Sequence, residues 1–221
     1  VGVQLLPLFY VTPDYPRWML RALVPALFAV LCTLSLATAW PDLFGPSARP
    51  ALYALLALGF SLFAIVTSGL QRRRARPRVD ATLLHWWSAL GALLAAALAW
   101  LLAAPPELIG MLLLIGIGIG LPSGMLFKIV PFLCWFHLQS RQITLGRMQV
   151  RIPHMHRLLP ERPTRWHAGL QLSAVLLTAG GMIDPSLARV GGIMVAVSAC
   201  WLLALLGTAV SRYRRTARAF S

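Results

Sequence analysis

Acidic side chains are scarce in this chain, in which six Asp and Glu residues stand against 20 Lys and Arg residues among 221. All six fall at predicted helix ends or in loops: Asp14, Asp42, Asp80, Glu107, Glu161 and Asp184. The sequence therefore gives no sign of a proton relay built from buried carboxylates. No Ser-His-Asp or Cys-His arrangement is visible either, so no catalytic residue is predicted and enzymatic activity is left open.

Cysteine and charge are also low. Only Cys32, Cys134 and Cys200 occur, each inside an apolar run, and this predicts buried free thiols with neither a disulfide nor a CxxC metal site. Charged residues make up 12% of the chain and hydrophobic residues 58%, which excludes an ordinary water-soluble domain.

Apolar runs of spanning length predict an all-α fold, a polytopic transmembrane helical bundle with six spanning helices. The segment 1–11 is too short to span and is predicted to be the tail of an upstream helix. Residues 1–221 are thus predicted to be a single transmembrane domain, the C-terminal part of a longer chain. The predicted spans are 18–40, 51–70, 81–103, 107–139 (broken at 120–124), 166–183 and 187–210.

The arginines predict the orientation of these helices. With this topology 17 of the 19 arginines lie on one side of the membrane, and only Arg49 and Arg189 lie on the other. The positive-inside rule makes that side cytoplasmic, so a bacterial inner-membrane protein with a cytoplasmic C-terminus is expected. The same rule explains the net charge of +14 without nucleic acid. The basic segment 141–165 is expected either to be a plain solvated loop or to lie along anionic lipid of the inner leaflet or another membrane subunit.

The stretch from Glu107 to Gln139 is the longest apolar one. As one helix its 33 residues would measure roughly 50 Å, against about 30 Å of hydrocarbon, so it is expected to break, tilt or protrude. The predicted break is at 120–124, because Pro122 removes a backbone donor. Glycines spaced by four form a stripe suited to close helix packing rather than a dinucleotide loop: Gly116, Gly120 and Gly124.

Lys128, the only lysine, lies within this stretch. An ionisable group in apolar surroundings is costly, so it is a functional candidate. Two roles are open: Lys128 reaches the inner headgroups, or it faces the bundle interior as a counter-charge for a haem propionate or a substrate.

All five histidines are predicted on the cytoplasmic side. His85, His137 and His167 are placed near three helix ends, where they are candidate metal ligands, and His154 and His156 lie in the loop between two of those ends. Facing imidazoles in a helical bundle are typical of haem and copper sites. The alternative is that these amphipathic rings simply prefer the membrane interface, as the tryptophans beside them do.

The segment GMLFKIVPFLCWFH at 124–137, together with QLLPLFYVTPDYP at 4–16, resembles bacterial multi-pass proteins related to haem-copper oxidase subunit I, including the NnrS-like proteins. The resemblance covers about 30 residues. It implies four-helix repeats, in agreement with a similarity between residues 4–9 and 128–133, and haem or copper bound through histidines. The family's helical histidine before Pro-Glu is missing here, so oxygen reduction is not expected.

These observations predict haem or copper binding by His85, His137 and His167, with His154 and His156 supporting and Lys128 as counter-charge. The process is expected to be respiratory, nitric-oxide or metal handling. Two other functions remain open. A transporter is favoured by two half-helices in 107–139, and an accessory subunit of a larger complex would pack through the glycine stripe.

Overall fold

A computed structural model describes residues 12–75, 79–147, 149 and 151–220, apart from the side chain of His156. The predicted helix tail at 1–11, and with it the first copy of the proposed repeat, lies outside these residues. The chain divides into two compact units, one made of residues 1–78 and 93–109 and the other of residues 79–92 and 110–221. The helix α4 (Ala81–Leu101) contributes residues to both.

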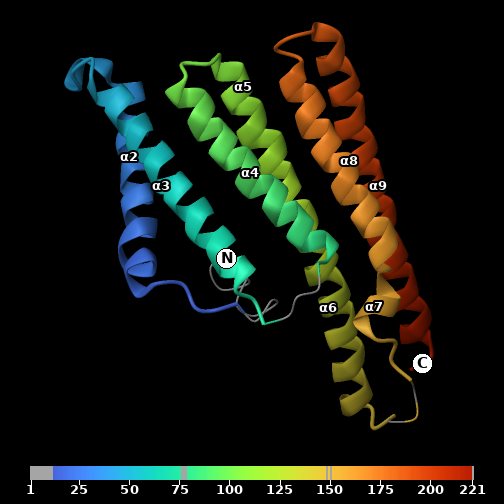
Figure 1. Cartoon of the computed structure of the whole chain (residues 1–221). Helices are drawn as coiled ribbons and strands as arrows, with labels where there is room; N and C mark the ends of the chain where they lie inside the picture. The colour runs from blue at the N-terminus through green and yellow to red at the C-terminus, as the bar shows by residue number, and fades with distance from the viewer. Residues whose placement is uncertain (1–11, 76–78, 148, 150, 221) are drawn as a thin grey trace. The chain divides into compact units, whose positions relative to one another are not determined.

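The first unit contains η1 (Met19–Leu23), α2 (Val24–Ala39), η2 (Pro41–Leu43) and α3 (Ala48–Arg72), where α2 and α3 form an antiparallel pair (Figure 1). Their contact is close, because a Cβ on Gly59 would lie 2.6 Å from Leu27 Cδ2. Before η1, the hydroxyl of Tyr15 is 3.0 Å from Thr67 Oγ1, which ties the entering chain to α3.

The second unit contains residues 79–92, which include the start of α4, and resumes at Gly110, near the end of α5 (Pro106–Met111). Its other elements are η3 (Leu112–Ile119), α6 (Gly120–Thr144), α7 (Met155–Leu158), α8 (Glu161–Gly180) and α9 (Pro185–Arg218). The helices α8 and α9 form an antiparallel hairpin (Figure 1). The two backbones meet at Gly191, where a Cβ would lie 2.6 Å from the Thr178 nitrogen.

The all-α prediction is confirmed, and six long helices are present in the described part of the chain. Five of them are long and apolar enough to cross a membrane: Met19–Ala39, Ala48–Arg72, Ala81–Leu101, Pro106–Thr144 and Pro185–Arg218. The chain is thus a multi-pass membrane protein. The sixth long helix, α8, is less apolar because it carries polar side chains such as His167 and Gln171, which are buried against its neighbours.

The predicted break at 120–124 is not present, because α5, η3 and α6 follow one another as a single helix from Pro106 to Thr144. The backbone instead widens into π-helical turns over Leu112–Ile119, just before Pro122. π-Helical turns accommodate a proline that cannot donate to the preceding turn. The hydroxyl of Ser123 donates to the Ile119 carbonyl at 2.7 Å and so supplies a hydrogen bond of its own.

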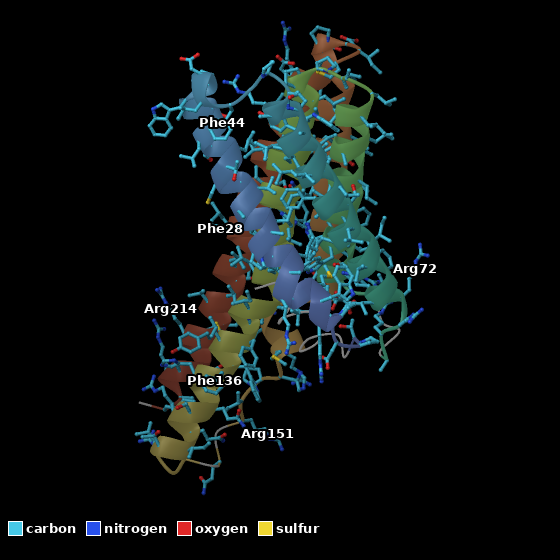
Figure 2. The ribbon with its side chains drawn as sticks, turned by 90° about the vertical axis from the view of Figure 1, so that its left-hand side faces the viewer. Phe28, Phe44, Arg72, Phe136, Arg151 and Arg214 are labelled. Atoms are coloured by element: carbon cyan, nitrogen blue, oxygen red, sulfur yellow. The ribbon has the colours of Figure 1, made fainter. Side chains whose placement is uncertain are left out.

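The cysteines are free, as predicted, but they are not buried. Cys32 on α2 and Cys200 on α9 are exposed, and Cys134 on α6 is half-buried. Their helices are apolar around most of their surface, so a cysteine within a run has no reason to face the protein rather than lipid. Basic side chains gather in the second unit where α6 and α9 end, near Arg151 and Arg214 (Figure 2).

The turn between α8 and α9 allows a first prediction, on pH dependence. Asp184 is the N-cap of α9, and its Oδ1 accepts a hydrogen bond of 2.8 Å from the Ser186 N–H, which lowers the pKa of this exposed carboxyl. A lowered folded-state pKa stabilises the fold above the unfolded-state value of about 3.9, and this contribution is lost as the pH falls below it. Asp184→Asn keeps a capping oxygen but no charge.

Thermal unfolding in detergent at pH 6 and pH 3 measures this effect. The wild-type chain is expected to lose more stability on acidification than Asp184→Asn, by a small margin. Equal losses in the two proteins would contradict the capping role of the carboxylate.

Candidate functional site

The ring of His85 on α4 lies beside the ring of His167 on α8 inside the second unit. His85 Nε2 is 3.2 Å from His167 Nδ1, and each side chain is only 1% exposed. Two of the three predicted metal ligands are therefore in direct contact. The sequence placed them near two helix ends, and the fold brings these ends together.

A buried chain of hydrogen bonds continues from this pair. His167 Nε2 lies 3.1 Å from the Ser198 carbonyl oxygen and 3.1 Å from its Oγ. The Ser198 hydroxyl donates to Gln171 Oε1 at 2.8 Å, and Gln171 Nε2 donates to the Ile115 carbonyl at 3.1 Å. The network thus joins η3, α4, α8 and α9.

The acceptors in this network fix where the protons lie. A carbonyl oxygen only accepts, so His167 Nε2 carries a hydrogen and His167 Nδ1 presents a lone pair. His85 Nε2–H must then donate to that lone pair, which leaves His85 Nδ1 as the unprotonated nitrogen. Among the described residues His85 Nδ1 has no hydrogen-bond partner, although it is buried.

Glycine allows α6 to approach this site closely. A Cβ on Gly124 would lie 2.4 Å from His85 Cβ, and one on Gly116 would lie 2.5 Å from Ala92 Cβ. The predicted glycine stripe is thus confirmed as a packing surface: Gly116 and Gly124 face α4 of the same chain, and Gly120 faces Gln171 of α8. Thr82 strengthens the contact by donating to the Gly124 carbonyl at 2.8 Å.

Lys128 has an acidic partner within the unit, since its Nζ is 2.9 Å from Asp80 Oδ2. The other oxygen of Asp80 accepts a 2.9 Å hydrogen bond from the Leu83 backbone N–H in the first turn of α4. Asp80 therefore caps α4 and joins it to α6, less than two turns before His85. This ion pair was not foreseen, although an Asp directly before an apolar helical run is a recognisable N-cap signal.

The predicted site residues His137 and His154 do not join the histidine pair. His137 is exposed and its ring packs edge-on against Tyr213, with 6.1 Å between the centroids. Because α6 is continuous, His137 lies 13 residues beyond Gly124, or about 20 Å along the helix axis. His154 is exposed at the start of α7, and the side chain of His156 lies outside the described residues.

Two neutral imidazoles that face each other have the chemistry to hold a single metal ion such as zinc, copper, iron or nickel. The two nitrogens are 3.2 Å apart, which is a hydrogen-bond distance and is also within the reach of two metal–imidazole bonds of about 2.0–2.1 Å. His167 also donates its other ring N–H to a backbone carbonyl, which is typical of a histidine that binds a metal.

Haem does not fit these residues. Phe127 packs edge-on against His167, with 5.0 Å between the ring centroids, and the backbone at Gly124 packs directly against His85. A porphyrin therefore has no room beside the two imidazole rings. No group of three or more His, Cys, Asp or Glu side chains with metal-binding geometry occurs in the described part of the chain. A metal here would have two histidine ligands.

Two members of the network were missed from the sequence. Gln171 follows His167 by four residues on α8, so a polar stripe within a predicted span was a usable signal. No comparable signal in the sequence pointed to Ser198, because serine is common in apolar helices. A scan against protein-family models, a search of curated proteins and a search of solved structures each found no match for this chain.

Proposed function

We propose that this chain is a bacterial inner-membrane protein that binds one copper ion through His85 and His167 near its cytoplasmic side, in metal handling or respiration. The observation that carries the proposal is the pair of buried imidazole nitrogens 3.2 Å apart. Neutral imidazole suits copper, and the Ser198 carbonyl holds the His167 tautomer whose Nδ1 faces His85.

In this proposal binding involves a change of tautomer at His85 and a shift of the two rings, since metal–imidazole bonds of about 2.0–2.1 Å do not fit on the line between the two nitrogens. The His85 proton now lies on Nε2, between the two rings, and would move to Nδ1, which has no partner among the described residues. Both imidazoles then remain neutral and present lone pairs to the same point. A buried pair of this kind suits the monovalent ion, because Cu(I) accepts few ligands and adds only one charge to the bundle.

The orientation in this proposal is supported by charge. Arginines gather at the end of the second unit where α6 and α9 finish, and the positive-inside rule makes such an end cytoplasmic. The alternative functions have less support. The half-helices that favoured a transporter are one continuous helix, and the glycine stripe offered to a larger complex contacts α4 and α8 of the same chain.

Copper titration under reducing conditions tests the proposal. The purified chain in detergent is titrated with Cu(I) against a chromogenic competitor, and one ion per chain is expected. His85→Asn and His167→Asn should each weaken binding by about 100-fold or more, while Gln171→Leu should weaken it by about tenfold through loss of outer-shell support.

His137→Asn is the matched control, since it removes a histidine from the same unit without touching the pair. Its affinity should equal that of the wild-type chain. A chain that binds no copper, or a His137 variant as weak as the His85 variant, would contradict the proposal. Circular dichroism of each variant separates loss of the ligand from loss of the fold.

A further inference from the structure

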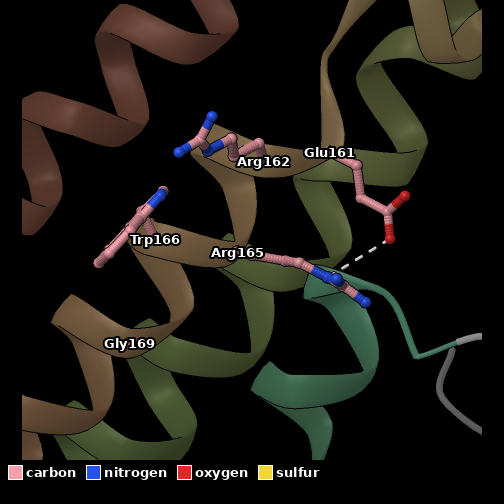
Figure 3. A pocket seen from close by; sticks show the side chains of 5 residues that line it. All are labelled: Glu161, Arg162, Arg165, Trp166 and Gly169. Carbon is pink, nitrogen blue, oxygen red and sulfur yellow. Dashed lines mark ion pairs between the residues drawn. The ribbon is translucent and has the colours of Figure 1, made fainter.

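A pocket of about 530 Å³ lies at the start of α8 and is lined by Glu161, Arg162, Arg165, Trp166 and Gly169 (Figure 3). Glu161 and Arg165 extend to one side and form an ion pair of 3.4 Å. Arg162 and Trp166 extend to the other side, and the nitrogen edge of the indole is turned toward the guanidinium (Figure 3). Two hydrogen-bond donors, the Arg162 guanidinium and the Trp166 indole N–H, thus lie on the same side of the pocket. Glu161, the only acid that lines the pocket, is already paired with Arg165.

No ion pair or hydrogen bond of the Arg162 side chain is formed with the described residues. Trp166 is 65% exposed, although it is a large apolar side chain. A guanidinium that has no partner among the described residues and lies beside an exposed indole is suited to an anion that carries an apolar body, because the indole N–H donates while the ring provides an apolar surface.

The surface of α8 continues from this pocket as a stripe. Residues at 162, 166, 169, 173 and 176 follow helical spacing, so they share one face. At Gly169 a Cβ would meet nothing within 4 Å, which leaves an open notch next to the indole. Ser173 turns its hydroxyl onto the Gly169 carbonyl at 3.0 Å, and Leu176 is 63% exposed. The stripe therefore has a cationic end at Arg162 and an apolar end at Leu176.

The length of the stripe matches one leaflet. Trp166 and Leu176 are ten residues apart, or about 15 Å along a helix, which is half of the roughly 30 Å hydrocarbon core. This order of side chains follows the profile of a phospholipid: a cation lies at headgroup level, an aromatic ring lies at the interface, and an open apolar track lies below it.

We propose that this stripe binds one anionic phospholipid. Its phosphate lies between Arg162 and the Trp166 indole N–H, and one acyl chain runs along Gly169 toward Leu176. The inference is independent of the copper site. Free phosphate offers the same anionic group but leaves the apolar track uncovered, so the lipid is the occupant that satisfies both parts.

Native mass spectrometry of the full chain in detergent, with added phosphatidylglycerol or phosphatidylcholine, tests this inference. One phosphatidylglycerol per chain should be retained, with phosphatidylcholine at least about fivefold weaker. Arg162→Gln should weaken phosphatidylglycerol binding about tenfold through loss of a charge-assisted bond. Gly169→Leu should weaken it by a similar factor, because the new side chain fills the notch.

Arg151→Gln is the matched control, since it removes one exposed positive charge from the same end of the unit without lining the pocket. It should bind phosphatidylglycerol within twofold of the wild-type chain. Equal losses in the Arg151 and Arg162 variants would mean diffuse attraction and would overturn the site. Competition by millimolar inorganic phosphate, together with unchanged binding in Gly169→Leu, would mean a phosphate site without lipid and would also overturn it.

Discussion

Gly124→Ala is expected to destabilise the chain by about 1–3 kcal/mol, the cost of overpacking a closely packed interior. The added methyl would lie 2.4 Å from His85 Cβ and 2.8 Å from His85 Cγ, so α4 and α6 would have to separate. The Thr82 hydrogen bond to the Gly124 carbonyl, now 2.8 Å, would lengthen with them. Because His85 moves with α4, copper affinity should fall in the same variant.

Gly118→Ala is the matched control for this prediction. It lies six residues away in the same helix, and a Cβ there meets only ordinary contacts, the nearest at 3.6 Å. Alanine favours a helix over glycine by up to about 1 kcal/mol, so this variant should be as stable as the wild-type chain or more stable. Unfolding by a denaturing detergent measures both, and a Gly124 variant as stable as the Gly118 variant would contradict the close contact.

The Lys128–Asp80 pair is expected to give the second large effect. Its two side chains are 21% and 29% exposed, so most of each charge is removed from water. Asp80→Asn retains a capping oxygen for the Leu83 N–H but deprives Lys128 of its carboxylate, and a loss of about 1–3 kcal/mol is expected. Lys128→Met should cost a similar amount, since it leaves the carboxylate without its cation.

The double variant distinguishes an ion pair from two unrelated contributions. When both charges of the pair are removed, neither is left without the other, so Asp80→Asn with Lys128→Met should be closer in stability to the wild-type chain than either single variant is. The exposed pair of Glu161 and Arg165 serves as control, and Glu161→Gln should change stability by less than about 0.5 kcal/mol. If the loss of stability in the Asp80–Lys128 double variant equals the sum of the losses in the two single variants, the two residues do not form a coupled pair.

These two contacts explain why the histidine pair is held so tightly. Asp80 fixes the first turn of α4 and its distance from α6, and Gly124 allows the helices to meet directly at His85. His167 is held from the opposite side by Ser198 of α9. The separation of the two rings is therefore set by four helices, not by the sequence around either histidine.

Much of the fold could be predicted from the sequence. Long apolar runs have few alternatives to helices, because a backbone in lipid must satisfy its own hydrogen bonds. The predicted spans 18–40 and 81–103 therefore agree closely with Met19–Ala39 and Ala81–Leu101. The break at 120–124 was wrong, because the π-helical turns just before it accommodate Pro122, and local propensity does not reveal such turns.

The candidate site was predicted only in part. Depth along a helix follows from residue spacing, so His85 and His167 were correctly placed near helix ends that could meet. The same reasoning failed for His137, because the helix continues from Pro106 to Thr144 and carries His137 about 20 Å beyond the contact between Gly124 and His85. Lys128 was recognised as unusual, but its partner Asp80 was not predicted, because their contact depends on how the loop before α4 packs against α6.

By itself the sequence determined that this chain forms apolar helices long enough to cross a membrane, because this follows from the transfer of side chains between water and lipid. It also determined that the glycines of α6 form a packing stripe. Only the tertiary structure decided which surface fills that stripe, which histidines meet, and that Ser198, Gln171 and Asp80 support them. Such contacts join residues far apart in the chain, and their geometry depends on the packing of several helices at once.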